Sequence, residues 1–103
     1  MLVTTSENIP GKSYQALGLV RGNIVYSKNI GRDIMANMKT IVGGEIKSYT
    51  DMVNEARDVA EQRMEEAAAQ KGADAVVAMR FAESTITQGT TELLAYGTAV
   101  KFV

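Results

Sequence analysis

Two segments near the carboxyl end of the chain, residues 72–81 and 92–103, are apolar at successive positions and predict strands with two apolar faces. In a strand, neighbouring side chains point to opposite faces, so a sheet with one wet face should alternate apolar and polar residues. The first segment instead places Ala75, Val77, Met79 and Phe81 on one face and Val76, Ala78 and Ala82 on the other. The second places Leu94, Tyr96, Val100 and Phe102 on one face and Leu93, Ala95 and Ala99 on the other. The sheet therefore needs a cover on both faces.

Only one segment of the chain, residues 48–71, predicts a helix long enough to cover a sheet face. The length of 103 residues fits a single domain over residues 1–103. A second copy of the same chain is the simplest cover for the other face, so the sequence predicts a homo-oligomer.

The other segments complete an α+β domain in the order β-β-α-α-β-β. We expect a mainly antiparallel four-stranded sheet packed on one long helix, plus a short helix. The expected strands are residues 1–5, 14–28, 72–81 and 92–103, with the short helix at residues 30–42 and a turn at residues 83–91.

The long helix has clear end signals. Ser48 and Asp51 resemble a capping box at its start, and Gly72 is a typical stop at its end. Arg57 and Arg63 flank its apolar stripe, from where they could reach a carboxylate on the sheet or across an interface. The expected stripe is Tyr49, Val53, Ala56, Ala60, Met64 and Ala67.

Two glycines, Gly18 and Gly22, lie inside the second expected strand, on one face with Ala16 and Val20. Glycine weakens a strand, and its presence there is typical of a bulge, a bend or a close approach of another backbone. We therefore expect this strand to coil or to let a neighbour pack closely against it.

The composition excludes several classes of function. The net charge is -1, whereas a nucleic-acid-binding domain needs a basic excess. No apolar run reaches the roughly 18 residues of a membrane span. The chain has no His and no Cys, which excludes Cys–His and Ser–His–Asp catalysis and the usual zinc and copper sites. We expect no catalytic residue, no metal ligand and no cofactor. The start of the chain does not resemble a signal peptide, and we expect a cytoplasmic location.

The charge is unevenly distributed along the chain. Residues 1–47 hold six basic and three acidic residues, a net of +3, and residues 48–72 hold three basic and six acidic residues, a net of -3. One interpretation is that the basic part of one copy meets the acidic helix of another. The other is that the acidic residues form an ordinary solvated helix face.

The best candidate ligand site is a polar cluster around the expected short helix, formed by Asn29, Arg32, Asp33 and Glu45. Asn29 is a candidate N-cap, and Arg32 beside a helix N-terminus could hold a phosphate or a carboxylate. Alternatively, Arg32 and Asp33 make ordinary caps and interface ion pairs.

Several short motifs resemble the YbjQ family of small bacterial and archaeal proteins. The motifs, which span the chain in order, are residues 18–22 (GLVRG), 29–33 (NIGRD), 41–45 (IVGGE), 49–50 (YT), 55–57 (EAR), 72–76 (GADAV) and 95–100 (AYGTAV). The resemblance implies a compact, dodecin-like α+β subunit that forms a ring, expected to be a pentamer. The family is described as a heavy-metal-binding domain, and the resemblance implies no enzyme activity.

Together these observations predict a non-enzymatic, homo-oligomeric binding or scaffold protein. Its expected partner is itself, with no nucleic acid and no membrane. One alternative is a binder of a metal ion or small anion at protomer interfaces, using Arg32, Asp33 and Glu45. Another is an enzyme with an Asp/Glu/Arg/Tyr site between protomers.

Overall fold

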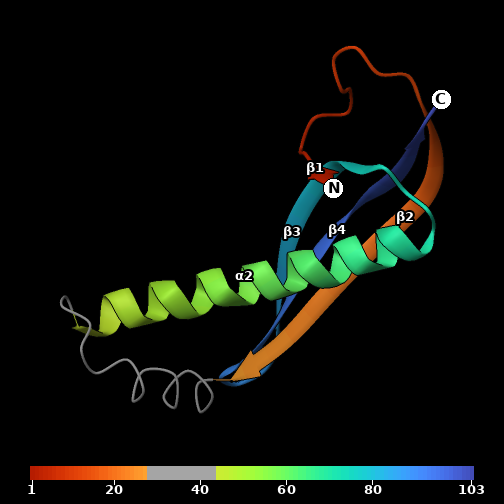
Figure 1. The fold of residues 1–103 in the computed structure, drawn as a ribbon. Helices are drawn as coiled ribbons and strands as arrows, with labels where there is room; N and C mark the ends of the chain where they lie inside the picture. Colours follow the sequence, from red (N-terminus) through yellow and green to blue (C-terminus); the bar gives the residue numbers. More distant parts are fainter. Residues whose placement is uncertain (28–43) are drawn as a thin grey trace.

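The computed structural model describes residues 1–27 and 44–103, and the side chains of α2 from residue 50 onward. Its elements are β1 (Leu2–Val3), β2 (Tyr14–Ser27), α2 (Gly44–Gln70), β3 (Ala75–Thr87) and β4 (Thr90–Phe102). The four strands form one sheet, and α2 lies across one of its faces (Figure 1). The chain is thus α+β. The expected short helix at residues 30–42 lies outside the described residues. No helix within the described ranges is apolar enough over 18 residues to cross a membrane.

The sheet has the strand order β1-β3-β4-β2 and is mixed rather than antiparallel throughout. β4 pairs antiparallel with both β2 and β3, but β1 runs parallel to β3. The sheet was expected to be mainly antiparallel, and the parallel β1–β3 pair makes it mixed. The reason is topological. The tight β3–β4 hairpin takes the centre of the sheet, and the chain crosses from β1 to the far edge before it forms β2.

The turn between β3 and β4 is shorter than the expected range of residues 83–91. The strands extend to Thr87 and Thr90, which pair with each other, and Gly89 has the positive φ of 77° that a tight turn favours. Residues 83–87 are polar except for Ile86, yet they continue β3. The backbone bonds of a strand do not require apolar side chains, and threonine suits the extended conformation.

Helix α2 starts at Gly44, four residues before the expected cap at Ser48, because the intervening residues are compatible with a helix and extend it by about one turn. The expected stop at Gly72 is confirmed. Gly72 has a φ of 77°, and its N–H donates to the carbonyl of Ala69 at 3.0 Å. The N–H of Ala73 donates to the carbonyl of Ala68 at 3.1 Å, which satisfies the end of the helix.

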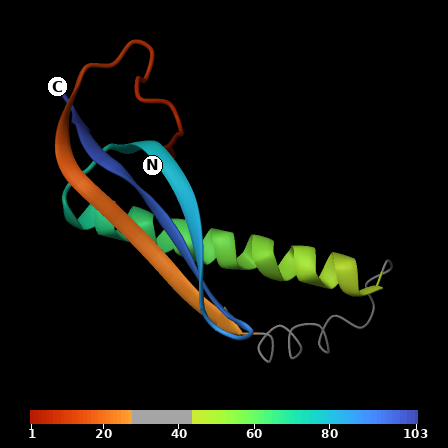
Figure 2. The ribbon, with the colours of Figure 1, turned by 180° about the vertical axis from the view of Figure 1, so that it is seen from behind.

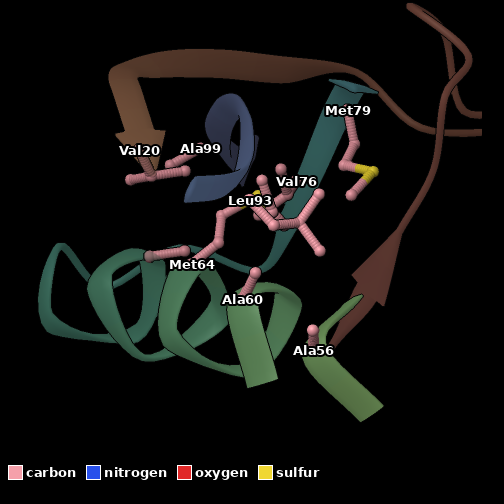
Figure 3. Packing of buried hydrophobic residues seen from close by; sticks show 10 residues of the cluster. Val20, Ala56, Ala60, Met64, Val76, Met79, Leu93 and Ala99 are labelled. Atoms are coloured by element: carbon pink, nitrogen blue, oxygen red, sulfur yellow. The ribbon is translucent and has the colours of Figure 1, made fainter. Parts of the chain in front are cut away.

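The apolar stripe of α2 packs on Val20, Val76, Leu93 and Ala99 of the sheet (Figure 3). Three of the expected stripe residues, Ala56, Ala60 and Met64, are buried, while Val53 and Ala67 lie half-buried at its margins. The side chain of Tyr49 lies outside the described residues. The buried stripe is Met52, Ala56, Ala60, Met64 and Ala68.

The two glycines of β2 have different roles. Gly18 has a φ of 126° at a register shift between Ala16 and Gly18, which is the expected bulge. At Gly22 a Cβ would overlap the main-chain nitrogen of Met64 and would lie 2.6 Å from the carbonyl carbon of Arg63. The backbone of α2 therefore rests directly on β2, as the expectation of close packing required.

The second face of the sheet is covered at one end by the chain itself. Residues 4–13, which we call the strap, carry Ile9 onto a small cluster that also contains Tyr14 and Phe102. The buried members of this cluster are Ala75, Val77 and Val100. A second copy is therefore not needed to cover this end, which corrects the expectation from the sequence. The residues of the strap have the local pattern of a turn. The periodicity of the sequence therefore did not predict that they contact the sheet.

No described element covers the rest of that face (Figure 2). We call this surface the open sheet face. It consists of the β2 and β4 residues that point away from α2, namely Leu19, Arg21, Asn23, Val25, Glu92, Leu94 and Tyr96.

Candidate functional site

The predicted ligand cluster cannot be assembled from the described residues. Asn29, Arg32 and Asp33 lie outside them. Glu45 is the second residue of α2, but its side chain is not among those described. The structure therefore neither brings these four residues together nor separates them.

A hollow of about 360 Å³ lies instead on the open sheet face, lined by Arg21, Asn23, Glu92 and Leu94. The strand register explains how these residues meet. Asn23 is paired with Leu94, and Val25 with Glu92, so alternate residues of β2 and β4 project from the same side of the sheet. Arg21 lies two residues along the strand from Asn23 and is paired with Tyr96.

The polar groups of the hollow are unequally satisfied. The amide nitrogen Nδ2 of Asn23 donates to Oε2 of Glu92 at 3.0 Å. The guanidinium of Arg21 makes no hydrogen bond or ion pair with any other residue of the described ranges. Because Glu92 already accepts from Asn23, the hollow holds one preorganised carboxylate–amide pair and one uncommitted cation.

This arrangement is suited to binding a carboxylate or phosphate group. A guanidinium presents two parallel donors to a carboxylate or phosphate, and Leu94 provides an apolar wall beside it. The four lining residues contain no nucleophile with an adjacent base. Among the described residues there is also no group of three or more His, Cys, Asp or Glu that could hold a metal ion.

The hollow was not predicted from the sequence. Arg21 and Asn23 alternate with Val20 and Gly22 along β2, which is a weak signal that they share a face. Glu92 comes from a segment 69 residues further along the chain from Asn23, and only the β2–β4 register brings it alongside.

Arg57 and Arg63, which flank the apolar stripe of α2, were expected to reach carboxylates. Both donate to other acceptors instead. Nη1 of Arg63 donates to the main-chain carbonyl of Asn23 at 2.7 Å. Nη1 of Arg57 donates to Oδ1 of Asn54 at 3.2 Å. Arg63 thus reaches the sheet, but it satisfies a backbone acceptor at the outer edge of β2.

A second polar group lies between α2 and the far end of the sheet, around the half-buried Tyr26. Burial raises the pKa of the Tyr26 hydroxyl, the negative charge of Glu83 raises it further, and the positive charge of Arg57 opposes both. The hydroxyl is therefore held neutral more firmly than in the unfolded chain.

This shift predicts a loss of stability at high pH. The stabilising contribution is complete below the unfolded pKa of about 10, and it decreases as the pH rises towards and through the raised pKa of folded Tyr26. Urea titrations between pH 8 and 11.5 should show the free energy of unfolding declining less steeply in Tyr26→Phe than in the wild type. Val25→Thr, which changes the neighbouring residue and keeps the Tyr26 hydroxyl, is the control and should show the wild-type slope. Equal slopes for wild type and Tyr26→Phe would contradict the assignment.

Comparison with known proteins gives a match along the whole chain. A YbjQ family model described as "putative heavy-metal-binding" matches residues 1–103. A UPF0145 protein of Vibrio parahaemolyticus is 59% identical over 104 residues, covering 100% of this chain and 99% of the relative. A UPF0145 protein of Thermotoga maritima is 54% identical over 102 residues, covering 98% of this chain and 96% of the relative.

A solved structure has the same fold at low sequence identity. It is a protein of unknown function from the DUF74 family of Pediococcus pentosaceus, with a TM-score of 0.70 and 17% identity. The alignment covers 100% of this chain and 98% of that one. None of the relatives named here carries an enzymatic name.

Proposed function

Because this chain belongs to the YbjQ family, also named UPF0145, we propose that it is a non-enzymatic binding or scaffold protein that works as a homo-oligomer. The expected assembly is a ring of dodecin-like subunits, with a pentamer as the expected stoichiometry.

The open sheet face is the observation that carries this proposal. Leu19 is 64% exposed and Val25 is 48% exposed on it, beside the half-buried Leu94 and Tyr96. Apolar side chains that gather on one exposed sheet face are typical of an interaction surface. The strap covers only the cluster around Val77 and leaves this region open.

The chemistry of the side chains supports a role in binding rather than in catalysis. The chain has neither His nor Cys, and the hollow on the open sheet face combines one free guanidinium with a satisfied carboxylate–amide pair. Such a site can hold a charged group but has no pair of groups arranged for proton transfer.

Mass measurement in solution tests the assembly. Native mass spectrometry and light scattering at micromolar concentration should give a single species of five copies of the 11.1 kDa chain, about 55 kDa. The same measurement at a series of dilutions shows whether smaller species exchange with the ring. A monomer throughout this range would overturn the proposal.

A small-anion binder is the second candidate function, and the free guanidinium of Arg21 favours it. The cluster of Asn29, Arg32, Asp33 and Glu45 is a further proposed ligand site, for an anion or a metal ion at a protomer interface. Isothermal titration with inorganic phosphate, citrate and Zn²⁺ tests both sites.

For the Arg21 site, we expect citrate to bind the wild type. The affinity of Arg21→Gln for citrate should be lower by about tenfold or more, because the substitution removes a charge-assisted hydrogen bond to the anion. Arg57→Gln removes the same charge from α2 and should bind citrate like the wild type. Citrate binding that Arg21→Gln leaves unchanged would exclude the hollow. If titration with phosphate, citrate and Zn²⁺ gives no heat of binding, the second candidate function is excluded.

A further inference from the structure

Each side of the sheet has a stretch of outer strand edge that no described segment pairs. β2 is an edge strand, and no described segment pairs with its outer side from Tyr14 to Tyr26. At the other edge, β1 pairs only with Ala75 and Val76 of β3. The strap continues this cover as far as Met79, whose N–H donates to the carbonyl of Thr4 at 3.0 Å. Beyond Met79, β3 is open on its outer side up to the hairpin.

The contact of Arg63 shows which backbone groups face outward. Because the Arg63 side chain donates to the carbonyl of Asn23, this carbonyl points away from β4. The N–H and C=O of alternate residues in an antiparallel strand point to the same side, so Arg21 and Val25 also face outward. The register through β4 then assigns the outward groups of β3 to Phe81 and Glu83.

Unpaired edges of this length attract other strands, and most proteins protect them. From Leu19 to Tyr26 the protection of β2 is slight, because the bulge lies before this stretch, at Gly18. The stretch contains no proline, and the Arg63 side chain occupies one outward carbonyl, that of Asn23. On β3 Phe81 is 42% exposed beside the open edge. An exposed aromatic residue next to unpaired backbone groups is a typical interface feature.

We propose that the outer edge of β2 in one copy pairs in parallel with residues 80–87 of β3 in the next copy. This inference rests on the proposed homo-oligomer and names its interface. β2 and β3 are both antiparallel to β4, so they run in the same direction within a chain. A head-to-tail joint between equivalent copies is therefore parallel. It satisfies both edges of every copy, and it closes into a ring if the rotation per copy allows.

The alternative joint, β2 against β2, is less satisfactory. It would form a two-fold dimer with a continuous sheet, but it would leave both β3 edges unpaired. The head-to-tail joint also buries Phe81 on the helix side of a neighbouring strand. Stoichiometry separates the two, since only the head-to-tail joint continues beyond two copies.

Amide hydrogen exchange on the wild-type assembly tests the interface without risk to folding. The outward amides of Arg21, Val25, Phe81 and Glu83 should exchange at least about a hundredfold more slowly in the assembly than amides exposed in the strap, such as that of Asn8. Fast exchange at these four amides in an intact oligomer would overturn the proposed joint while leaving the oligomer itself in place. A monomeric wild type would instead overturn the proposed function.

Proline substitution provides a second test. In Val25→Pro the lost N–H faces outward, so no bond to β4 is removed, whereas a strand from another copy loses a donor. We expect Val25→Pro to shift native mass spectra from the oligomer to the monomer, with its circular dichroism retained. Val25→Thr keeps the N–H and should assemble like the wild type. A Val25→Pro protein that retains the wild-type stoichiometry would contradict the joint, as would a wild-type dimer.

Discussion

Gly22→Val should unfold the chain or leave it far less stable than the wild type. The added Cβ would overlap backbone atoms of α2 at Met64 and Ala60, which cannot rotate away as a side chain would. The helix must therefore move off the sheet, which separates the buried cluster around Leu93. We expect a loss of about 4 kcal/mol or more in the free energy of unfolding, a size seen only for severe core disruption.

Urea denaturation at a fixed protein concentration measures this loss. Ala16→Val is the matched control, because it adds the same branched side chain to an exposed position of the same strand. Its effect should stay within about 0.5 kcal/mol. Gly22→Ala should also destabilise, since the overlap begins at the Cβ itself. If Gly22→Val unfolded at the same urea concentration as the wild type, the close approach of α2 to β2 would be wrong.

Met64→Ala should be the most destabilising of the conservative truncations in the core. Met64 is fully buried, and it is among the largest side chains enclosed between α2 and the sheet. Its neighbours along the stripe are Ala60 and Ala68, which have no side-chain atoms beyond Cβ to fill the space. Truncation of a buried methionine typically costs about 2–5 kcal/mol, and we expect the upper half of this range.

The test uses the same urea titration, with Ile86→Ala as the control. Ile86 is 54% exposed near the hairpin, so its truncation should cost less than about 1 kcal/mol. Native mass spectrometry of both variants separates loss of chain stability from loss of assembly. A cost at Met64 no greater than at Ile86 would show that α2 does not pack on the sheet as described.

Local patterns predicted much of the helix–sheet layer. The central stripe of α2 follows from residue spacing, because a helix repeats its face every three or four residues. The stop at Gly72 follows from glycine's preference for positive φ. Gly18 and Gly22 could be identified as special positions, but their spacing alone did not separate a bulge from a close approach.

Local residue spacing did not predict the candidate site on the open sheet face. Arg21 and Glu92 are far apart in sequence, and nothing near either residue indicates that they line one hollow. Strand pairing brings them together, and a register shift of one residue would move Glu92 to the face covered by α2. The cover provided by the strap was missed for the same reason, since Ile9 finds its contacts on strands far along the chain.

The amino-acid sequence alone determined the class of the fold, the helix with its apolar stripe, the two-faced hairpin strands and the absence of thiol and imidazole chemistry. These properties depend on residue type and short-range spacing. The assignment of β2 residues to the two faces was decided by the tertiary structure. Strict alternation would place Tyr14 and Val20 on one face, but the bulge at Gly18 shifts the pattern. Tyr14 joins the cluster under the strap, and Val20 packs against α2. The bulge is a register shift in the pairing of β2 with β4, and this pairing between segments far apart in the chain exists only once the chain is folded.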